Sequence, residues 1–208
     1  MKFKLTKRRA VVLTLIFIAV FSALLMVMFS LKRDLEEWDK IEIEGGSVTV
    51  KNGKFEFNFP MEDSCAGVVS KESCNLNQSR ITVYLSCAGR GGLCLLISNN
   101  KDTTENPLRS QPSDTYAIHM AGPFEKIFVY RSIGKNWRTV KEKTWAAESN
   151  TFMIEIVNGT IKFYEGETCI YEENYQLPSY NCYIYIFSFN MDGAGVDWAE
   201  NFNMNKIE

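Results

Sequence analysis

Six cysteines are the residues of this sequence with the most evident covalent chemistry. All of them lie after residue 64, at Cys65, Cys74, Cys87, Cys94, Cys169 and Cys182. An even number of cysteines without any C-x-x-C spacing is typical of a disulfide framework in an oxidising compartment. The short segments between them favour the sequential pairs 65–74, 87–94 and 169–182, although other pairings stay open. A zinc site is the alternative, but the chain has a single histidine, His119, so we expect none.

Two aspartates near the C-terminus offer the oxygen ligands that calcium prefers. Asp192 and Asp197 lie in the glycine-containing segment 190–197, whose backbone carbonyls are further hard ligands. A glycine-enabled turn before a final strand needs no ion, and it is the interpretation that we prefer for this segment. We therefore expect no cofactor, with a structural calcium ion at Asp192 and Asp197 as the alternative; the chain also lacks the glycine-rich loop that binds nucleotide phosphates.

The sequence contains no complete catalytic motif. There is no G-x-S-x-G, and a Ser-His-Asp triad would have to use His119. Acid–base chemistry by paired carboxylates stays open through Glu155 with Glu165 or Glu167. We therefore predict a non-enzymatic protein without catalytic residues.

Two tryptophans, Trp137 and Trp145, flank the polar segment 138–144. An exposed indole stacks against the C–H face of a sugar ring, so a pair on one sheet face would form a glycan-binding surface. Packing in the core is the alternative for at least one of them. These two are the ligand-binding residues that the sequence predicts.

Two sequons mark candidate glycosylation sites at Asn77 and Asn158. Asn158 is followed by Gly159, which together form the signature of a two-residue hairpin turn. We expect the turn at Asn158 and regard Asn77, in a polar segment between cysteines, as the better acceptor.

The elements that position these residues begin with an uncharged stretch over 10–31, behind a basic head at 1–9. At 1.5 Å per residue a helix of this length spans about 33 Å, enough for a membrane core of about 30 Å. The positive-inside rule places the head in the cytoplasm, a juxtamembrane stalk at 32–40 and a domain at 41–208 outside the cell. Two alternatives are a cleaved secretory signal and a pilin-like leader, which the Arg9-Ala10 junction resembles.

All 25 acidic residues lie after residue 33, so the outer part is acidic although the whole chain carries only −2. An acidic exterior without a basic cluster argues against nucleic acid as a partner. The membrane is the expected partner of the apolar segment, which also offers a route to oligomers.

Alternation with a period of two residues recurs along the outer chain and predicts about a dozen short strands. The clearest hairpin runs over 151–164 around Asn158-Gly159. Further strands are expected over 81–85, 93–97, 116–120, 127–130, 138–143, 168–171, 182–189 and 196–203. We read 99–114 as one surface loop. The fold class is an all-β antiparallel sandwich preceded by one transmembrane helix.

Both ends of the outer chain resemble the concanavalin A-like lectin/glucanase jelly rolls. The opening segment from Trp38 through Gly46–Val50 to Asn52-Gly53 is similar to that family's first strands, and Val196-Asp197-Trp198 to its last. The resemblance implies a jelly roll whose first and last strands lie side by side. It implies either glycan binding or β-glucan hydrolysis, but the hydrolases' E-x-D-x-x-E strand does not occur here.

Three functions follow in order of preference. The first is a membrane-anchored surface module that binds glycans or another surface protein. The second is a structural, pilin-like or envelope subunit whose apolar helix assembles into a filament or lattice. The third is a tethered glycoside hydrolase.

Overall fold

The computed structural model describes residues 37–51, 54–87, 91–110, 112–145 and 151–207. The predicted cytoplasmic head at 1–9 and membrane helix at 10–31 lie outside these ranges, as does the turn at Asn52-Gly53. Within the described ranges no helix has the length and apolar character needed to cross a membrane. From Trp38 onward the chain forms one compact unit.

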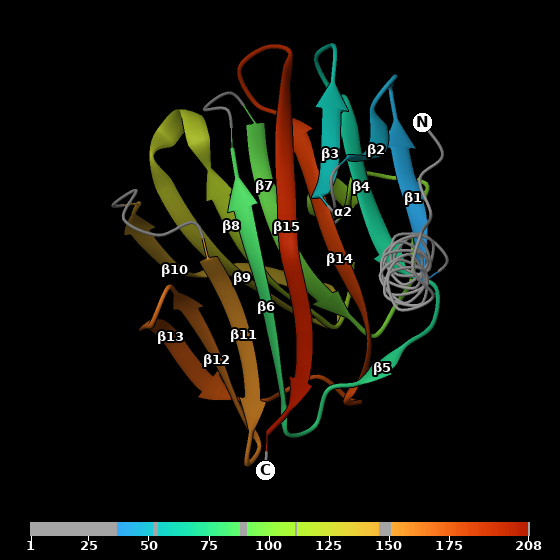
Figure 1. Cartoon of the computed structure of the whole chain (residues 1–208). Coiled ribbons are helices and arrows are strands. Elements are labelled where there is room, and N and C mark those ends of the chain that lie inside the picture. Colours follow the sequence, from blue (N-terminus) through green and yellow to red (C-terminus); the bar gives the residue numbers. More distant parts are fainter. Residues whose placement is uncertain (1–36, 52–53, 88–90, 111, 146–150, 208) are drawn as a thin grey trace, which may run out of the picture. The chain divides into compact units, whose positions relative to one another are not determined.

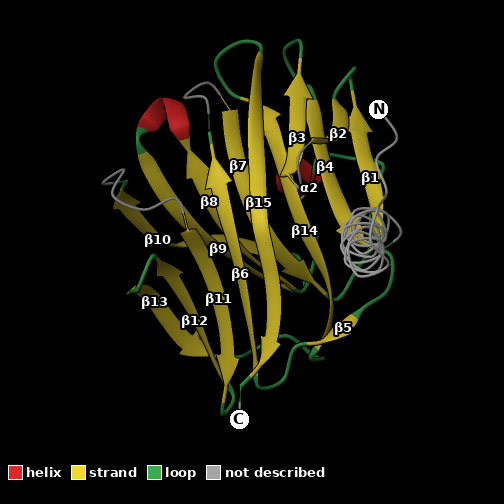
Figure 2. Cartoon of the chain, in the orientation of Figure 1, coloured by secondary structure: helices red, strands yellow, loops and turns green. Residues whose placement is uncertain are grey.

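This unit consists almost entirely of strands (Figures 1 and 2). In chain order the elements are β1 (Trp38–Ile43), β2 (Ser47–Lys51), β3 (Lys54–Phe59), β4 (Cys65–Ser70), β5 (Cys74–Asn75), β6 (Ser79–Ser86), β7 (Gly91–Ser98), α2 (Pro107–Ser110), β8 (Thr115–Ala121), the 3-10 turn η1 (Gly122–Phe124), β9 (Lys126–Ile133), β10 (Asn136–Thr144), β11 (Thr151–Val157), β12 (Thr160–Glu165), β13 (Thr168–Asn174), β14 (Asn181–Asn190) and β15 (Gly195–Lys206).

The described strands pair into two antiparallel sheets. Sheet A has the order β1-β4-β14-β7-β8-β9-β10, with β5 paired to β14. Sheet B has the order β13-β12-β11-β6-β15-β3-β2 and lies in front of sheet A in Figure 1. The expected all-β antiparallel sandwich is therefore confirmed.

Alternating side chains explain why these segments form a sandwich. Where the strands are regular, every second residue faces the partner sheet, and the fully buried residues between the sheets include Phe57, Leu85, Leu95, Phe152 and Ile186. The hairpin predicted at 151–164 is present as β11 and β12.

The turn of this hairpin has the expected geometry. Its φ values are +51° at Asn158 and +74° at Gly159. Positive φ at both central residues is what a type I′ turn requires, and asparagine followed by glycine adopts it with the least strain.

The compact unit begins at Trp38, three residues before the expected start of the domain at residue 41. Residues 38–40 belong to β1 because the Trp38 ring packs edge-on against Phe55 and Phe202, with centroids 5.8 and 5.1 Å away. The closing strand β15 lies beside β3 and not beside β1. The last strand, β15, therefore lies next to the β2–β3 hairpin near the start of the domain, and not next to the first strand.

Polar contacts join the two sheets at several points. The buried Ser188 hydroxyl on β14 donates to Asp197 Oδ2 on β15 over 2.5 Å. At another edge Arg131 Nη1 on β9 lies 2.5 Å from Glu173 Oε2 on β13, and both side chains are mostly buried. Tyr171 OH also donates to Glu173 Oε2, over 3.0 Å.

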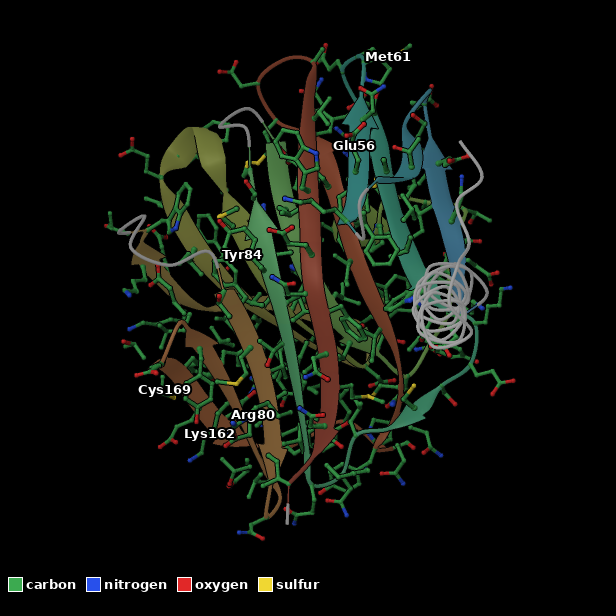
Figure 3. All side chains as sticks on the ribbon, viewed as in Figure 1. Glu56, Met61, Arg80, Tyr84, Lys162 and Cys169 are labelled. Atoms are coloured by element: carbon green, nitrogen blue, oxygen red, sulfur yellow. The ribbon has the colours of Figure 1, made fainter. Side chains whose placement is uncertain are left out.

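The outward face of sheet B is charged. Arg80 pairs with Glu155 at 2.6 Å, and Lys54 with Glu200 at 2.7 Å. Figure 3 shows Arg80 and Lys162 on this face. Glu155 points outward as its flanking isoleucines predict, but it is 8% exposed because Arg80 and Tyr164 contact its carboxylate.

The Arg131–Glu173 pair yields a stability prediction. Arg131→Met should lower the free energy of unfolding by about 3 kcal/mol, because it leaves a largely buried carboxylate without its cation. The double variant Arg131→Met/Glu173→Gln should recover most of this loss. Urea unfolding measures both.

Lys162→Met is the matched control. Its pair with Glu172 is longer, at 3.6 Å, and more exposed, so its loss should stay below about 1 kcal/mol. Equal losses for the two single variants would contradict the assignment of Arg131–Glu173 as a stabilising tie.

Candidate functional site: an aromatic platform on sheet A

The outward face of sheet A is divided into a covered half and an open half. Segment 99–114 crosses the face over β14, where Tyr185 OH donates to Asn100 O and accepts from Asp102 N, at 2.9 and 2.8 Å. Lys101 Nζ lies 2.7 Å from Asp39 Oδ2 on β1. The predicted surface loop is therefore a cover over apolar residues.

The helix α2 within this cover is short and locally capped. The Asn106 side chain accepts from Leu108 N at 3.0 Å, and Pro107 occupies the first helical position, where no amide hydrogen is needed. Leu108 packs against the buried cluster on this face. The cap is thus held both by hydrogen bonds and by apolar contact.

The open half carries five aromatic side chains that we call the aromatic platform: His119, Phe128, Tyr130, Trp137 and Phe189. His119 and Phe128 lie directly opposite each other on β8 and β9. The rings form a continuous series, with centroid distances of 5.3 Å for His119–Phe189, 5.9 Å for His119–Phe128, 5.9 Å for Phe128–Tyr130 and 5.4 Å for Tyr130–Trp137. All except His119 are half-buried.

A glycine explains how His119 fits at the centre of the platform. A Cβ at Gly92 on β7 would lie 2.6 Å from His119 Nε2 and 2.6 Å from Met191 Sδ. The absence of a side chain therefore lets the imidazole and Phe189 close over β7. His119 is 3% exposed, its Nε2 is buried without a hydrogen-bond partner, and burial lowers its pKa to about 3.

Polar groups surround the platform. The Tyr130 hydroxyl lies 3.4 Å from His119 Nδ1, and burial raises its pKa to about 12, with smaller contributions from Cys94 and Glu142. At neutral pH it is a protonated hydroxyl that donates and accepts. Lys126 Nζ donates to Glu142 Oε1 over 2.5 Å, and the exposed Thr139 lies opposite Tyr130. This combination of ring faces with hydroxyl, ammonium and carboxylate groups suits a ligand with both C–H faces and hydroxyls.

The structure separates the two predicted tryptophans. Trp137 belongs to the platform, whereas Trp145 packs against the core between the sheets, and its backbone N–H donates to Glu125 O over 2.8 Å. Their even spacing would place them on one face of a regular strand. A register shift between Thr139 and Lys141 on β10 reverses the alternation, so they face opposite sides.

The two predicted calcium ligands do not converge. Asp192 is exposed, while Asp197 is fully buried and accepts from Ser188. Among the described residues there is no group of three or more potential metal ligands. The segment 190–197 turns through Gly193, whose φ is +99°.

The sequential cysteine pairs are not formed in the structure. Cys65, Cys94, Cys169 and Cys182 are free cysteines, and each expected pair includes at least one of them. The physical reason is register: Cys182 lies directly opposite Cys74 on β5, whereas Cys169 lies opposite Tyr164. Cys87 Sγ lies 3.1 Å from Gly91 O.

The candidate glycosylation sites are both exposed. Asn158 Oδ1 accepts from Gln78 Nε2 over 3.2 Å, which joins the hairpin turn to the segment that carries Asn77. Glycosylation of either residue stays a prediction.

The proposed carboxylate pairs are separated by the sheet itself. Glu155 lies on the outward face of sheet B with Arg80, whereas Glu165 is buried opposite Phe152, on the inward side, and pairs with Lys143. Glu167 is exposed in the turn between β12 and β13. These side chains do not share a cleft.

Four members of the platform escaped prediction from sequence. Phe128, Tyr130, Phe189 and His119 lie in strands whose residues are apolar on both faces, so alternation cannot identify an exposed aromatic row. The only local signal was the run Phe128-Val129-Tyr130, with two aromatic rings on one side of β9.

The architecture is similar to that of several solved carbohydrate-active proteins. The carbohydrate-binding module CBM66 from Bacillus subtilis superposes with a TM-score of 0.55 at 11% identity, over 81% of this chain and 95% of the module. The exoplasmic/lumenal domain of VIP36 in its Ca2+/Man-bound form gives 0.58 at 11% identity, over 82% and 83%. A Bacillus licheniformis β-glucanase gives 0.55 at 14% identity, over 80% and 89%.

These likenesses define the fold as the jelly roll of the concanavalin A-like lectins and glucanases, as the sequence predicted. No protein-family model and no curated relative matches the sequence. At such low identity the likeness concerns the fold, so function has to be argued from the platform.

His119 yields a pH prediction. Its pKa is about 3 in the fold and about 6.5 in an unfolded chain, so below pH 6.5 the unfolded state binds the proton first. Stability from the neutral imidazole is therefore complete above pH 6.5 and falls as the pH decreases towards 3. Relative to His119→Gln, the wild type should lose about 3 kcal/mol between pH 7.5 and 4.5 in urea unfolding.

The difference between the two pH profiles reports on His119 alone, because the chain has no other histidine and both proteins share all carboxylates. Parallel pH profiles for the two proteins would show that the imidazole is accessible to protons in the fold.

Proposed function

We propose that this protein is a membrane-anchored, non-enzymatic binding module that recognises glycans through the aromatic platform of sheet A. The observation that carries the proposal is the continuous series of rings ending at Trp137, in which every ring except the buried His119 is half-buried. Rings of this kind present flat apolar area with little loss of side-chain freedom on binding. Sugar rings have C–H faces that match such a surface.

The polar groups at the platform supply the second requirement, which is orientation. The Tyr130 hydroxyl, the Lys126–Glu142 pair and Thr139 lie within the same part of the sheet and can exchange hydrogen bonds with sugar hydroxyls. The solved neighbours named for carbohydrate binding share this fold, which supports the same ligand class here.

Binding is favoured over hydrolysis because of the carboxylates. Glycoside hydrolysis by the usual mechanism needs two carboxyl groups about 5–9 Å apart across the bond to be cleaved. The platform contributes Glu142, which is already paired with Lys126, while Glu155 and Glu165 lie on opposite sides of sheet B.

A glycan array with the full-length protein tests the function. The protein should be kept in a detergent without a sugar headgroup, since a glycosidic detergent would compete for the site. We expect binding to neutral glycans, and Trp137→Ala should weaken it about tenfold through loss of one stacking surface.

Trp198→Ala is the matched control. Trp198 is a half-buried tryptophan on the outward face of sheet B, where its Nε1 donates to Glu56 Oε2 over 3.3 Å, so its loss should leave glycan binding unchanged. Melting curves of both variants show that they are folded. Absence of binding across the array would contradict glycan binding. An equal effect of both substitutions would contradict the assignment of the aromatic platform as the binding site.

The membrane anchor is part of the proposal, and its support is the uncharged stretch at 10–31 with the basic head before it. Full-length protein should stay in the membrane pellet after alkaline carbonate, and protease added outside intact cells should remove the C-terminal domain but not an N-terminal tag. A mature chain starting at residue 10 or 11 would favour the pilin-like filament subunit, and release by carbonate would contradict the anchor.

A further inference from the structure

β5 is the least supported strand among those described. It consists of Cys74–Asn75 and pairs with the beginning of β14, at the right-hand lower edge of the molecule in Figure 1. One further backbone bond, from Leu76 N to Tyr180 O at 2.9 Å, continues this contact. The Leu76 side chain is fully buried, so the segment is attached to the core on one side.

The register of this pairing places two cysteines face to face. Cys74 and Cys182 are direct Cα partners in an antiparallel pair. Directly opposite residues of antiparallel strands have Cα atoms about 4.5–5.5 Å apart and side chains on the same face. A disulfide requires about 4.4–6.8 Å between Cα atoms, so the backbone is already in place.

Both side chains also point the same way in this molecule. Cys182 is fully buried in the core between the sheets, and Cys74 packs against the same cluster. Asn99 Nδ2 donates to Cys182 Sγ over 3.2 Å, and Tyr175 OH lies 3.4 Å from it. These contacts fix the position of the Cys182 sulfur, whereas the Cys74 sulfur, 4.0 Å from Glu72 O, would have to turn about its Cα–Cβ bond to meet it.

The remaining cysteines do not compete for these two. Cys65 and Cys94 lie on β4 and β7, on either side of β14, opposite Phe189 and Phe187 respectively. Phe187 and Phe189 are five and seven residues from Cys182 along β14, so Cys94 and Cys65 lie roughly 16–23 Å along the strand from Cys182, beyond the reach of a disulfide. Cys169 is exposed on β13 in sheet B, and Cys87 follows the last residue of β6, whereas Cys74 precedes the first residue of that eight-residue strand.

We propose that Cys74 and Cys182 form a cross-strand disulfide that fastens β5 to β14 when the domain matures in an oxidising compartment. The oxidant is a small disulfide such as oxidised glutathione. The half-buried Cys74 attacks it, one glutathione thiol leaves, and Cys182 then displaces the second from the mixed disulfide. Two protein thiols are oxidised, one disulfide is reduced to two thiols, and both protons pass to the leaving groups.

The accessibility of the two sulfurs explains the order of these steps. Cys182 is shielded, and burial raises its pKa to about 11, so it is a poor initial nucleophile at neutral pH. Once formed, the bond is shielded on the Cys182 side as well, which slows its reduction. The Cys74–Cys182 disulfide therefore has a structural role and not a redox-active one.

Peptide mapping of the full-length protein tests the proposal. The reduced protein is placed in a buffer with oxidised glutathione, quenched by alkylation, digested without reductant and analysed by mass spectrometry. We expect a linked peptide pair containing Cys74 and Cys182, which is lost in Cys74→Ser and retained in Cys94→Ser. Alkylated Cys74 and Cys182, or a bond from either to another cysteine, would overturn the proposal.

A melting experiment gives a second measurement that does not rely on the digest. The oxidised protein should melt about 5–15 °C above the same protein after reduction, whereas Cys74→Ser should show no such difference. Cys74→Ser changes a half-buried surface residue, so it is expected to fold. Equal responses of wild type and Cys74→Ser to reductant would assign any stabilisation to another bond and reject this one.

Discussion

The arrangement of this molecule depends on sheet A having apolar side chains on both faces. Ile41, Val69, Leu96 and Phe187 point away from sheet B, yet each is fully buried. An apolar sheet face in water is unfavourable by roughly 25 cal/mol per Å2, so it needs a cover. Segment 99–114 provides that cover over β14, and its attachment through the Tyr185 hydroxyl satisfies two backbone groups in the same contact. The part of this face that segment 99–114 does not cover carries the aromatic platform, whose rings, except His119, remain partly exposed to solvent.

Small irregularities decide which side chains reach this open region. On β10 the register shift after Thr139 places Trp137 on the outward face and returns Trp145 to the core. On β7 the missing side chain of Gly92 makes room for the imidazole of His119. The shift places the two tryptophans on opposite faces, and a side chain at position 92 would clash with the imidazole, so the composition of the platform depends on these two local features.

These departures also show how far the sequence could predict the structure. Period-two alternation correctly predicted most strands and the Asn158-Gly159 turn, since both depend on near neighbours in the chain. It missed β4, whose small residues Cys65-Ala66-Gly67 carry no alternation because both faces are buried. It could not predict that Cys182 faces Cys74, because that pairing joins residues distant in sequence. The polar segment beside Trp137 identified that tryptophan, but nothing in the sequence identified Tyr130 or Phe189. They lie on strands with apolar side chains on both faces, where the covering segments decide which side chains are exposed.

The charge state of the platform limits the ligands that it suits. His119 is neutral at physiological pH because burial lowers its pKa to about 3, and the Tyr130 phenol is protonated because burial raises its pKa to about 12. Lys126 and Glu142 neutralise each other. The platform is thus an uncharged surface on an acidic domain, where an anionic polysaccharide would gain little attraction and meet repulsion from the surrounding carboxylates. Stacking and hydrogen bonds between uncharged groups are not screened by salt, so under the proposed glycan-binding function this face would select uncharged sugars by contact and not by long-range charge.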